Sequence, residues 1–132
     1  MLRLPFGTGE LVEKVISGTA SEVGKRTLYL LLTTWDAAGG GPFAATAIGT
    51  VGVDKAVTTL QEMFMTKIFD NLLTALGADR VRLRASLCAS QLVGLGIMRY
   101  AARTEPLASA DVNVVVNAMA PTLQRYLIGD ID

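Results

Sequence analysis

The sequence predicts an all-α domain of about six helices. Apolar residues recur three and four positions apart over most of its 132 residues, which is the spacing of helices with a buried face. The segments between these stretches contain Gly or Pro, and no segment has the strand–turn–strand pattern of a hairpin. Because the chain contains no internal repeat and no low-complexity tract, we expect residues 1–132 to form a single domain.

Two helices are predicted before the first glycine-rich loop. Thr8 or Gly9 begins a short helix that ends before Gly18, and Thr19 or Ser21 caps a longer helix that ends near residue 37. The loop that follows, AAGGGP, has the glycines of a phosphate-binding loop. It lacks the Gly-Lys-Ser/Thr ending and a preceding strand, so we interpret it as a connector.

Two further helices are predicted in the middle of the chain. Residues 43–51 are small and apolar and are expected to form a short helix. Asp54 caps a long helix over residues 54–76, which Gly77 ends in the usual C-terminal position. The main apolar stripe of this long helix consists of Val57, Leu60, Phe64, Ile68 and Leu72.

The helix predicted over residues 79–103 organises the rest of the chain. Its first turn carries Arg80, Arg82 and Arg84, which we expect on the solvent side. The stretch that follows is apolar on nearly all sides, so it has to be covered on more than one face. Gly94 and Gly96 each cost about 1 kcal/mol relative to alanine in a helix interior. They indicate a close approach of another backbone, and a kink or the helix end is the alternative.

The last predicted helix spans residues 109–129, with Ser109 as cap and Asp111 in the first turn, and Pro121 should kink or restart it. This helix and its predecessor are both apolar on more than one side. We therefore expect them to form half of an intersubunit four-helix bundle in a homodimer. The alternative is that the same residues are the core of this domain. The expected interface residues are Leu92, Leu95, Arg99, Val112, Val115, Val116, Met119, Leu123 and Tyr126.

Aromatic and sulfur-containing side chains form a second group of interest. Methionine and aromatic residues suit adaptable apolar pockets, in which a few polar groups orient the ligand. We therefore predict a pocket for a small apolar effector, and ordinary core packing is the alternative. The expected ligand-binding residues are Leu31, Thr34, Trp35, Phe43, Met63, Phe64, Lys67, Cys88, Gln91 and Met98.

Composition argues against several classes of function. The 12 basic and 12 acidic residues give a net charge of zero, and no basic block is present to bind DNA phosphates. The absence of histidine and the single cysteine exclude a catalytic triad with histidine, an internal disulfide and a cysteine metal cluster. We expect no enzymatic activity, no cofactor and no metal. No apolar run is long enough to span a membrane and no signal peptide is evident, so we expect a cytoplasmic protein.

Several sequence motifs in the last third of the chain are similar to those of a known family. They are ASQLVGL from Ala89, the pair Arg99-Tyr100, EPLAS from Glu105 and APTLQRYL from Ala120. The stretch that contains them closely resembles the C-terminal end of actinobacterial transcriptional regulators of the tetracycline-repressor (TetR) family. Residues 28–36, which end in Trp-Asp, and residues 64–77 show a looser similarity.

This resemblance implies a fold and a function. It implies an all-helical homodimer whose C-terminal domain binds a small apolar effector, and whose N-terminal helix-turn-helix domain reads operator DNA. Regulators of this family are typically repressors that the effector releases from DNA. Nothing before Leu11 resembles a helix-turn-helix, so operator DNA would be contacted only through an N-terminal domain not in this chain. The alternative function is a stand-alone helical dimerisation or protein-interaction module without ligand or DNA binding.

Overall fold

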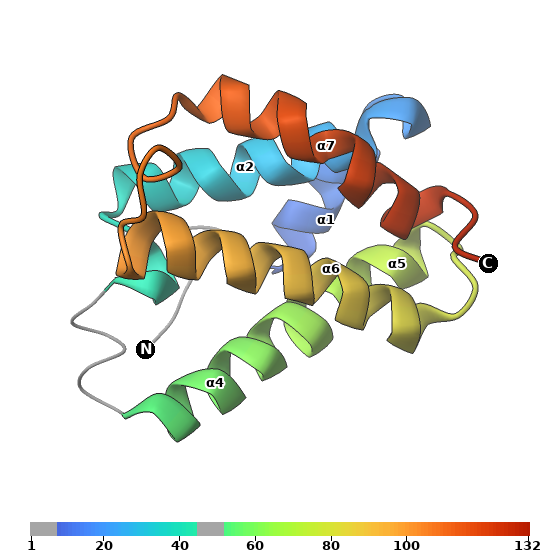
Figure 1. Ribbon diagram of the computed structural model, residues 1–132. Helices are drawn as coiled ribbons and strands as arrows, with labels where there is room; N and C mark the ends of the chain where they lie inside the picture. Colours follow the sequence, from blue (N-terminus) through green and yellow to red (C-terminus); the bar gives the residue numbers. More distant parts are fainter. Residues whose placement is uncertain (1–7, 45–51) are drawn as a thin grey trace.

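The computed structural model describes residues 8–44 and 52–132, which form helices and no strand within these two ranges (Figure 1). The predicted all-α fold is confirmed. The helices are α1 (Thr8–Ile16), α2 (Val23–Ala37), α4 (Val53–Gln61), α5 (Asn71–Ala75), α6 (Val81–Gly96) and α7 (Val112–Ile128), with π-helices at Glu62–Asp70 and Ile97–Ala101 and 3-10 turns at Ala20–Glu22 and Gly41–Phe43. No helix of the described ranges is long and apolar enough to cross a membrane.

Helix α6 runs between two groups of helices (Figure 1). On one side, α7 lies along α2, and these two helices share the most extensive contact in the fold. On the other side, α6 packs mainly on the π-helix Glu62–Asp70, which joins α4 to α5. Fully buried leucine and phenylalanine side chains fill the space between these elements, and each contributes roughly 1.5–3 kcal/mol by leaving water. The prediction that α6 is covered on more than one face is therefore confirmed.

The π-helix Glu62–Asp70 changes which residues share a face. A π-helix has a wider turn, with hydrogen bonds between residues five apart. Phe64 and Phe69, which are five apart, accordingly stack with ring centroids 6.4 Å from each other. The predicted stripe is confirmed at Leu60, Phe64, Ile68 and Leu72, which are buried together with Met63 and Phe69. The prediction that Val57 belongs to it is wrong, because Val57 is 54% exposed.

The predicted helix boundaries differ from the observed ones at several places. Gly52 is the N-cap of α4, so Asp54 lies in the first turn and does not cap the helix. Asp111, not Ser109, is the N-cap of α7, because its carboxylate accepts a hydrogen bond from the Asn113 N–H at 2.8 Å. Ser109 instead donates its hydroxyl to Glu105. Helix α7 continues through Pro121, so the helix does not restart at this proline. The helix predicted over residues 43–51 lies largely outside the described residues, and Phe43 itself ends a 3-10 turn.

The two glycines of α6 have different surroundings. A Cβ atom on Gly96 would lie 2.2 Å from the Phe43 ring, so glycine is required there by a close approach. The approaching group is an aromatic side chain, whereas the sequence predicts a second backbone. A Cβ on Gly94 would meet nothing within 4 Å. Gly94 is exposed, so the absence of its side chain leaves the backbone of α6 accessible at this position.

The prediction that Arg84 faces solvent is wrong. Arg84 is buried against the C-terminal end of α7, where its guanidinium donates to the carbonyl oxygens of Tyr126 at 2.9 Å and Gly129 at 2.7 Å. The last carbonyl groups of a helix have no partner within the helix, and a cation near them is also favoured by the helix dipole. Arg84 therefore holds the end of α7 against α6.

Candidate functional site

Four aromatic rings from different parts of the chain meet beside the end of α6. We call them the aromatic cluster: Trp35 of α2, Phe43 of the 3-10 turn, Phe64 of the first π-helix and Tyr100 of the second. The Trp35 ring centroid lies 5.2 Å from Phe43 and 5.6 Å from Phe64, both edge to face. Tyr100 stacks on Phe43 at 6.2 Å. Such pairs contribute about 0.5–1.5 kcal/mol beyond the area that they bury.

Trp35 has an unusual feature within this cluster. The residue is 1% exposed, and its indole Nε1–H has no hydrogen-bond acceptor among the residues that the structure describes. A Cβ atom on Gly41 would lie 2.6 Å from Trp35 Cδ1 and 3.3 Å from Nε1, so this edge of the indole faces the glycine turn. Gly41 has φ +53°, a conformation in which glycine is favoured.

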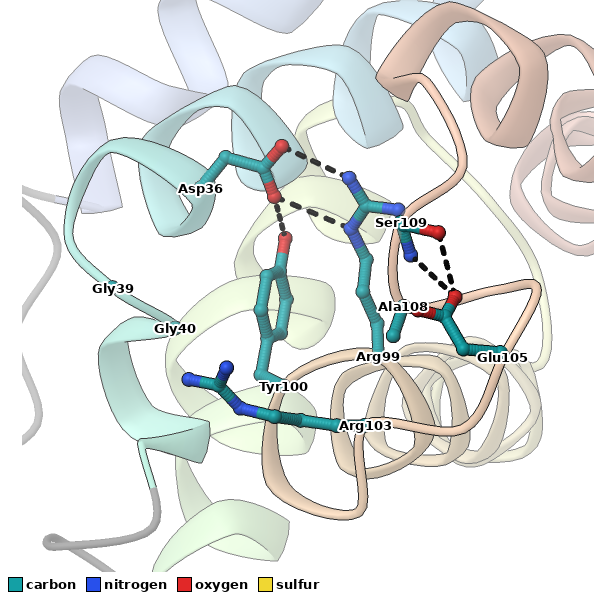
Figure 2. A pocket seen from close by; sticks show the side chains of 9 residues that line it. All are labelled: Asp36, Gly39, Gly40, Arg99, Tyr100, Arg103, Glu105, Ala108 and Ser109. Carbon is teal, nitrogen blue, oxygen red and sulfur yellow. Dashed lines mark hydrogen bonds and ion pairs between the residues drawn. The ribbon is translucent and has the colours of Figure 1, made fainter.

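The next residue, Asp36, connects the cluster to α6. Its carboxylate accepts hydrogen bonds from Arg99 Nε at 3.2 Å, Arg99 Nη2 at 3.0 Å and the Tyr100 hydroxyl at 2.6 Å (Figure 2). Arg99 also donates to the carbonyl oxygens of Leu107 and Ala110, both at 2.8 Å, just before α7. We call Asp36, Arg99 and Tyr100 the polar network. It ties the end of α2, the end of α6 and the approach to α7 together.

The charges in the polar network stabilise one another. Burial alone would raise the pKa of Asp36, but the hydrogen bonds from Arg99 and Tyr100 and the charge of Arg99 outweigh it and bring the pKa below its ordinary value. The hydrogen bond to Asp36 raises the pKa of Arg99. Burial and the neighbouring Asp36 raise the pKa of Tyr100. At neutral pH the network therefore consists of an ion pair and a neutral phenol.

A surface pocket of about 400 Å³ opens over the polar network (Figure 2). One wall contains the bonded pair Glu105 and Ser109, and the side chain of Arg103 contributes a further cation. The pocket is more polar than the aromatic cluster beneath it. Its lining residues are Asp36, Gly39, Gly40, Arg99, Tyr100, Arg103, Glu105, Ala108 and Ser109.

Most of the residues expected to bind a ligand lie in one continuous core. Trp35, Phe43 and Phe64 form three of the four rings of the aromatic cluster. Cys88 is also buried, and burial raises the pKa of its thiol to about 12, although the charge of Arg84 acts to lower this pKa. Lys67 and Met98 do not join them, because both are exposed. Of the rest, Leu31, Met63 and Cys88 are buried in the same core, and Thr34 and Gln91 are half-buried.

The residues expected at a dimer interface divide into two groups. The structure places Leu92, Leu95, Arg99, Val115, Val116 and Leu123 inside the core of the chain, where they have almost no surface left for a second copy. Helical periodicity identifies the faces of a helix but not what covers each face, which explains this difference. Val112, Met119 and Tyr126 are half-buried and keep accessible surface.

A different set of small and apolar residues of α6 and α7 keeps accessible surface. Gly94 and Met98 are exposed on α6 and its π-helical extension, and Leu87 is half-buried. Val114 and Ala118 lie four apart on the solvent side of α7, and Val114 is 62% exposed. We call these five residues the α6–α7 face.

Sequence reasoning missed Asp36 and Tyr100 as a connected pair. Both stand in segments that resemble the TetR family, but nothing in their spacing of 64 residues indicates contact. The available signal was the resemblance itself, because the Trp-Asp end of residues 28–36 and the pair Arg99-Tyr100 both belong to it. Arg84 was missed because it was grouped with Arg80 and Arg82, the two exposed arginines that precede it.

Comparisons with known proteins agree with the architecture. Residues 21–127 match the family model described as "Tetracyclin repressor-like, C-terminal domain". The fold is similar to the crystal structure of a TetR-family regulator from Streptomyces coelicolor A3, with 28% sequence identity and a TM-score of 0.67, over 91% of this chain and 82% of that chain. No curated protein sequence matches significantly.

Proposed function

Because this chain belongs to the tetracyclin repressor-like C-terminal domain family, we propose that it is the effector-binding and dimerisation domain of a transcriptional repressor. A small, mostly apolar effector binds at the aromatic cluster. It binds one arrangement of the dimer better than the other and so shifts the population toward that arrangement. The shift changes the separation of two helix-turn-helix domains outside this chain and releases operator DNA.

The observation that carries this proposal is the position of Asp36. It directly follows Trp35 in α2, and it pairs with Arg99 and Tyr100 at the end of α6. Arg99 in turn holds the backbone before α7 through Leu107 and Ala110. An effector that moves the Trp35 ring therefore acts on both helices that carry the α6–α7 face.

The α6–α7 face supports the dimerisation half of the proposal. It combines leucine, valine and methionine with Gly94 and Ala118, whose small size lets a second helix approach closely. A contiguous exposed apolar patch is typical of an interaction site. The partner that we propose is a second copy of this chain, related by a twofold axis so that the same face meets itself.

Dimerisation is tested with matched valine substitutions. Val114→Glu places a charge on the α6–α7 face, and Val57→Glu makes the same change on α4, where Val57 is 54% exposed. Burying an unpaired carboxylate is costly, so Val114→Glu should raise the dimer dissociation constant at least about tenfold. Analytical ultracentrifugation measures it. The dimer proposal is wrong if Val114→Glu and Val57→Glu give the same dissociation constant as the unmodified protein.

Effector binding is tested with two neutral bicyclic probes, coumarin and 1,2-dihydronaphthalene. Trp35 is the only tryptophan, so its indole N–H gives one resonance in a ¹⁵N-labelled sample. We expect saturable binding by calorimetry and a shift of this resonance with at least one probe. If neither probe binds or raises the melting temperature, the effector proposal fails.

A second candidate function is a helical interaction module without an effector. The exposed α6–α7 face favours it, since dimerisation alone would explain that face. The two functions differ in the ligand titration. A stable dimer that binds neither probe supports the interaction module.

A further inference from the structure

We infer that the effector carries an uncharged hydrogen-bond acceptor, such as a ketone, lactone or amide oxygen, which binds the indole N–H of Trp35. This inference rests on the proposed effector site in the aromatic cluster. It adds a chemical class to an effector that the sequence describes only as small and apolar.

The first argument is the unsatisfied donor. The indole Nε1–H of Trp35 can only donate, and it is buried without an acceptor among the described residues. Leaving such a group unpaired costs about 1–3 kcal/mol. A ligand that supplies an oxygen recovers this free energy, whereas a pure hydrocarbon does not.

The second argument is that the protein groups nearest this edge are already engaged. The carbonyl oxygen of Gly40 accepts from the Phe43 N–H at 3.0 Å, and that of Gly41 accepts from the Ala44 N–H at 3.2 Å. The backbone oxygen of Trp35 accepts from Gly40 N–H at 2.7 Å. The glycine turn thus approaches the indole edge with each of these carbonyl oxygens bonded to a backbone N–H, and none of them accepts from the indole. Gly41 has no side chain that could supply an acceptor, which leaves this position open to an oxygen of the ligand.

The third argument concerns charge. Phe43, Phe64 and Tyr100 surround Trp35 with uncharged rings. Arg99, the cation of the polar network, already donates to two carboxylate oxygens and two carbonyl oxygens, and Arg103 lines the surface pocket instead of the aromatic cluster. A carboxylate or phosphate bound beside Trp35 would find Arg99 already paired and would lie close to the charge of Asp36. The acceptor that fits this site is therefore neutral.

The test compares coumarin, which has a lactone oxygen, with 1,2-dihydronaphthalene, which has the same two-ring skeleton and no oxygen. Titration calorimetry should give about tenfold tighter binding of coumarin, the value of one recovered hydrogen bond. Trp35→Phe keeps an aromatic ring and removes the donor. In this variant the preference for coumarin should fall to less than about twofold, while the affinity for the hydrocarbon stays within about twofold.

The indole resonance gives an independent readout in the unmodified protein and does not depend on the stability of the variant. Coumarin should shift the indole proton downfield, and 1,2-dihydronaphthalene should not. Coumarin-3-carboxylate is the charged control and should bind at least about tenfold more weakly than coumarin.

The outcomes separate the inference from the proposed function. Equal affinity for both neutral probes, unchanged by Trp35→Phe, overturns the inference and leaves the effector site intact. Tighter binding of the carboxylate also overturns it. If no probe binds, the proposed effector site fails and the inference fails with it.

Discussion

Two buried arginines near opposite ends of α6 provide an informative comparison. Arg84 and Arg99 are 6% and 7% exposed, and both donate to backbone carbonyl groups at an end of α7. Arg84 holds the C-terminal end of α7 through Tyr126 and Gly129, and Arg99 holds the segment before α7 through Leu107 and Ala110. The pair fixes α7 against α6 at both ends.

The two arginines differ in their acidic partners. The carboxylate paired with Arg84 belongs to Asp79, whose side chain is 76% exposed at the start of α6. The carboxylate paired with Arg99 belongs to Asp36, which is 33% exposed, follows Trp35 directly and also binds Tyr100. The two arginines are therefore similarly buried and carry the same charge, but they have different roles. Arg84 stabilises the fold, while Arg99 also connects the candidate effector site to α6 and α7.

The largest effect on stability is expected at Arg84. Arg84→Met should lower the free energy of unfolding by about 3 kcal/mol, because the carbonyl groups at the end of α7 lose a charged donor. The indole resonance of Trp35 should not move. Arg82→Met is the matched control, since Arg82 is exposed and its pair with Asp70 is worth less than about 1 kcal/mol. Urea unfolding at one protein concentration measures both, and equal losses would contradict the role of Arg84.

Arg99→Met should cost slightly less, about 2–3 kcal/mol, because Asp36 is partly solvated after the ion pair is lost. Unlike Arg84→Met, it should also shift the indole resonance of Trp35, since Asp36, which follows Trp35 directly, loses its ion pair. Arg103→Met, four residues later and exposed, is the control and should change stability by less than about 0.5 kcal/mol. An unmoved indole resonance in Arg99→Met would break the distinction between the two arginines.

This comparison also shows where sequence reasoning ends. The helical spacing predicts α6 and α7 as long neighbouring helices, and the structure confirms both elements. It does not predict that Arg84 and Arg99 face inward, because their partners are distant carbonyl groups and an aspartate 63 residues away. Periodicity assigns residues to a face, whereas only the three-dimensional packing shows which element covers that face.

The same limit of helical periodicity explains why the predicted ligand-binding residues agree better with the structure than the predicted interface residues do. Trp35, Phe43 and Phe64 could be grouped from the sequence because buried aromatic residues in a small domain converge on one core. Leu92 and Leu123 could not be separated from interface residues, because core and interface use the same apolar side chains. Exposed positions such as Val114 become recognisable only after the core is assigned.

The third prediction concerns Asp36 and its dependence on pH. Asp36→Asn should cost about 1–2 kcal/mol at pH 7, a value reduced for the partial exposure of the carboxylate. The folded state lowers the pKa of Asp36 below 3.8, so the ionised carboxylate stabilises the fold above this pH. The stability difference between the two proteins should shrink as the pH falls below 3.8 and passes the lower pKa of the folded state.

The control for Asp36→Asn is Asp79→Asn, which makes the same change beside Arg84. Because the side chain of Asp79 is largely exposed, Asp79→Asn should lower the free energy of unfolding at pH 7 by much less than Asp36→Asn does. Urea unfolding between pH 3 and pH 7 measures both variants. A stability difference for Asp36→Asn that does not change over this range would show that the ion pair with Arg99 contributes nothing to folding.

The smallest effect is expected at Tyr100. Tyr100→Phe keeps the ring beside Phe43 and removes only the hydroxyl that donates to Asp36, so it should cost about 1 kcal/mol. The hydroxyl also helps to lower the pKa of Asp36 in the folded state, so in this variant the acid loss of stability should be smaller and should end at a higher pH. Tyr126→Phe on α7 is the control, and it should not change how the free energy of unfolding falls at low pH. If both variants behave alike, Tyr100 contributes only its ring, and Arg99 alone connects Asp36 to α6.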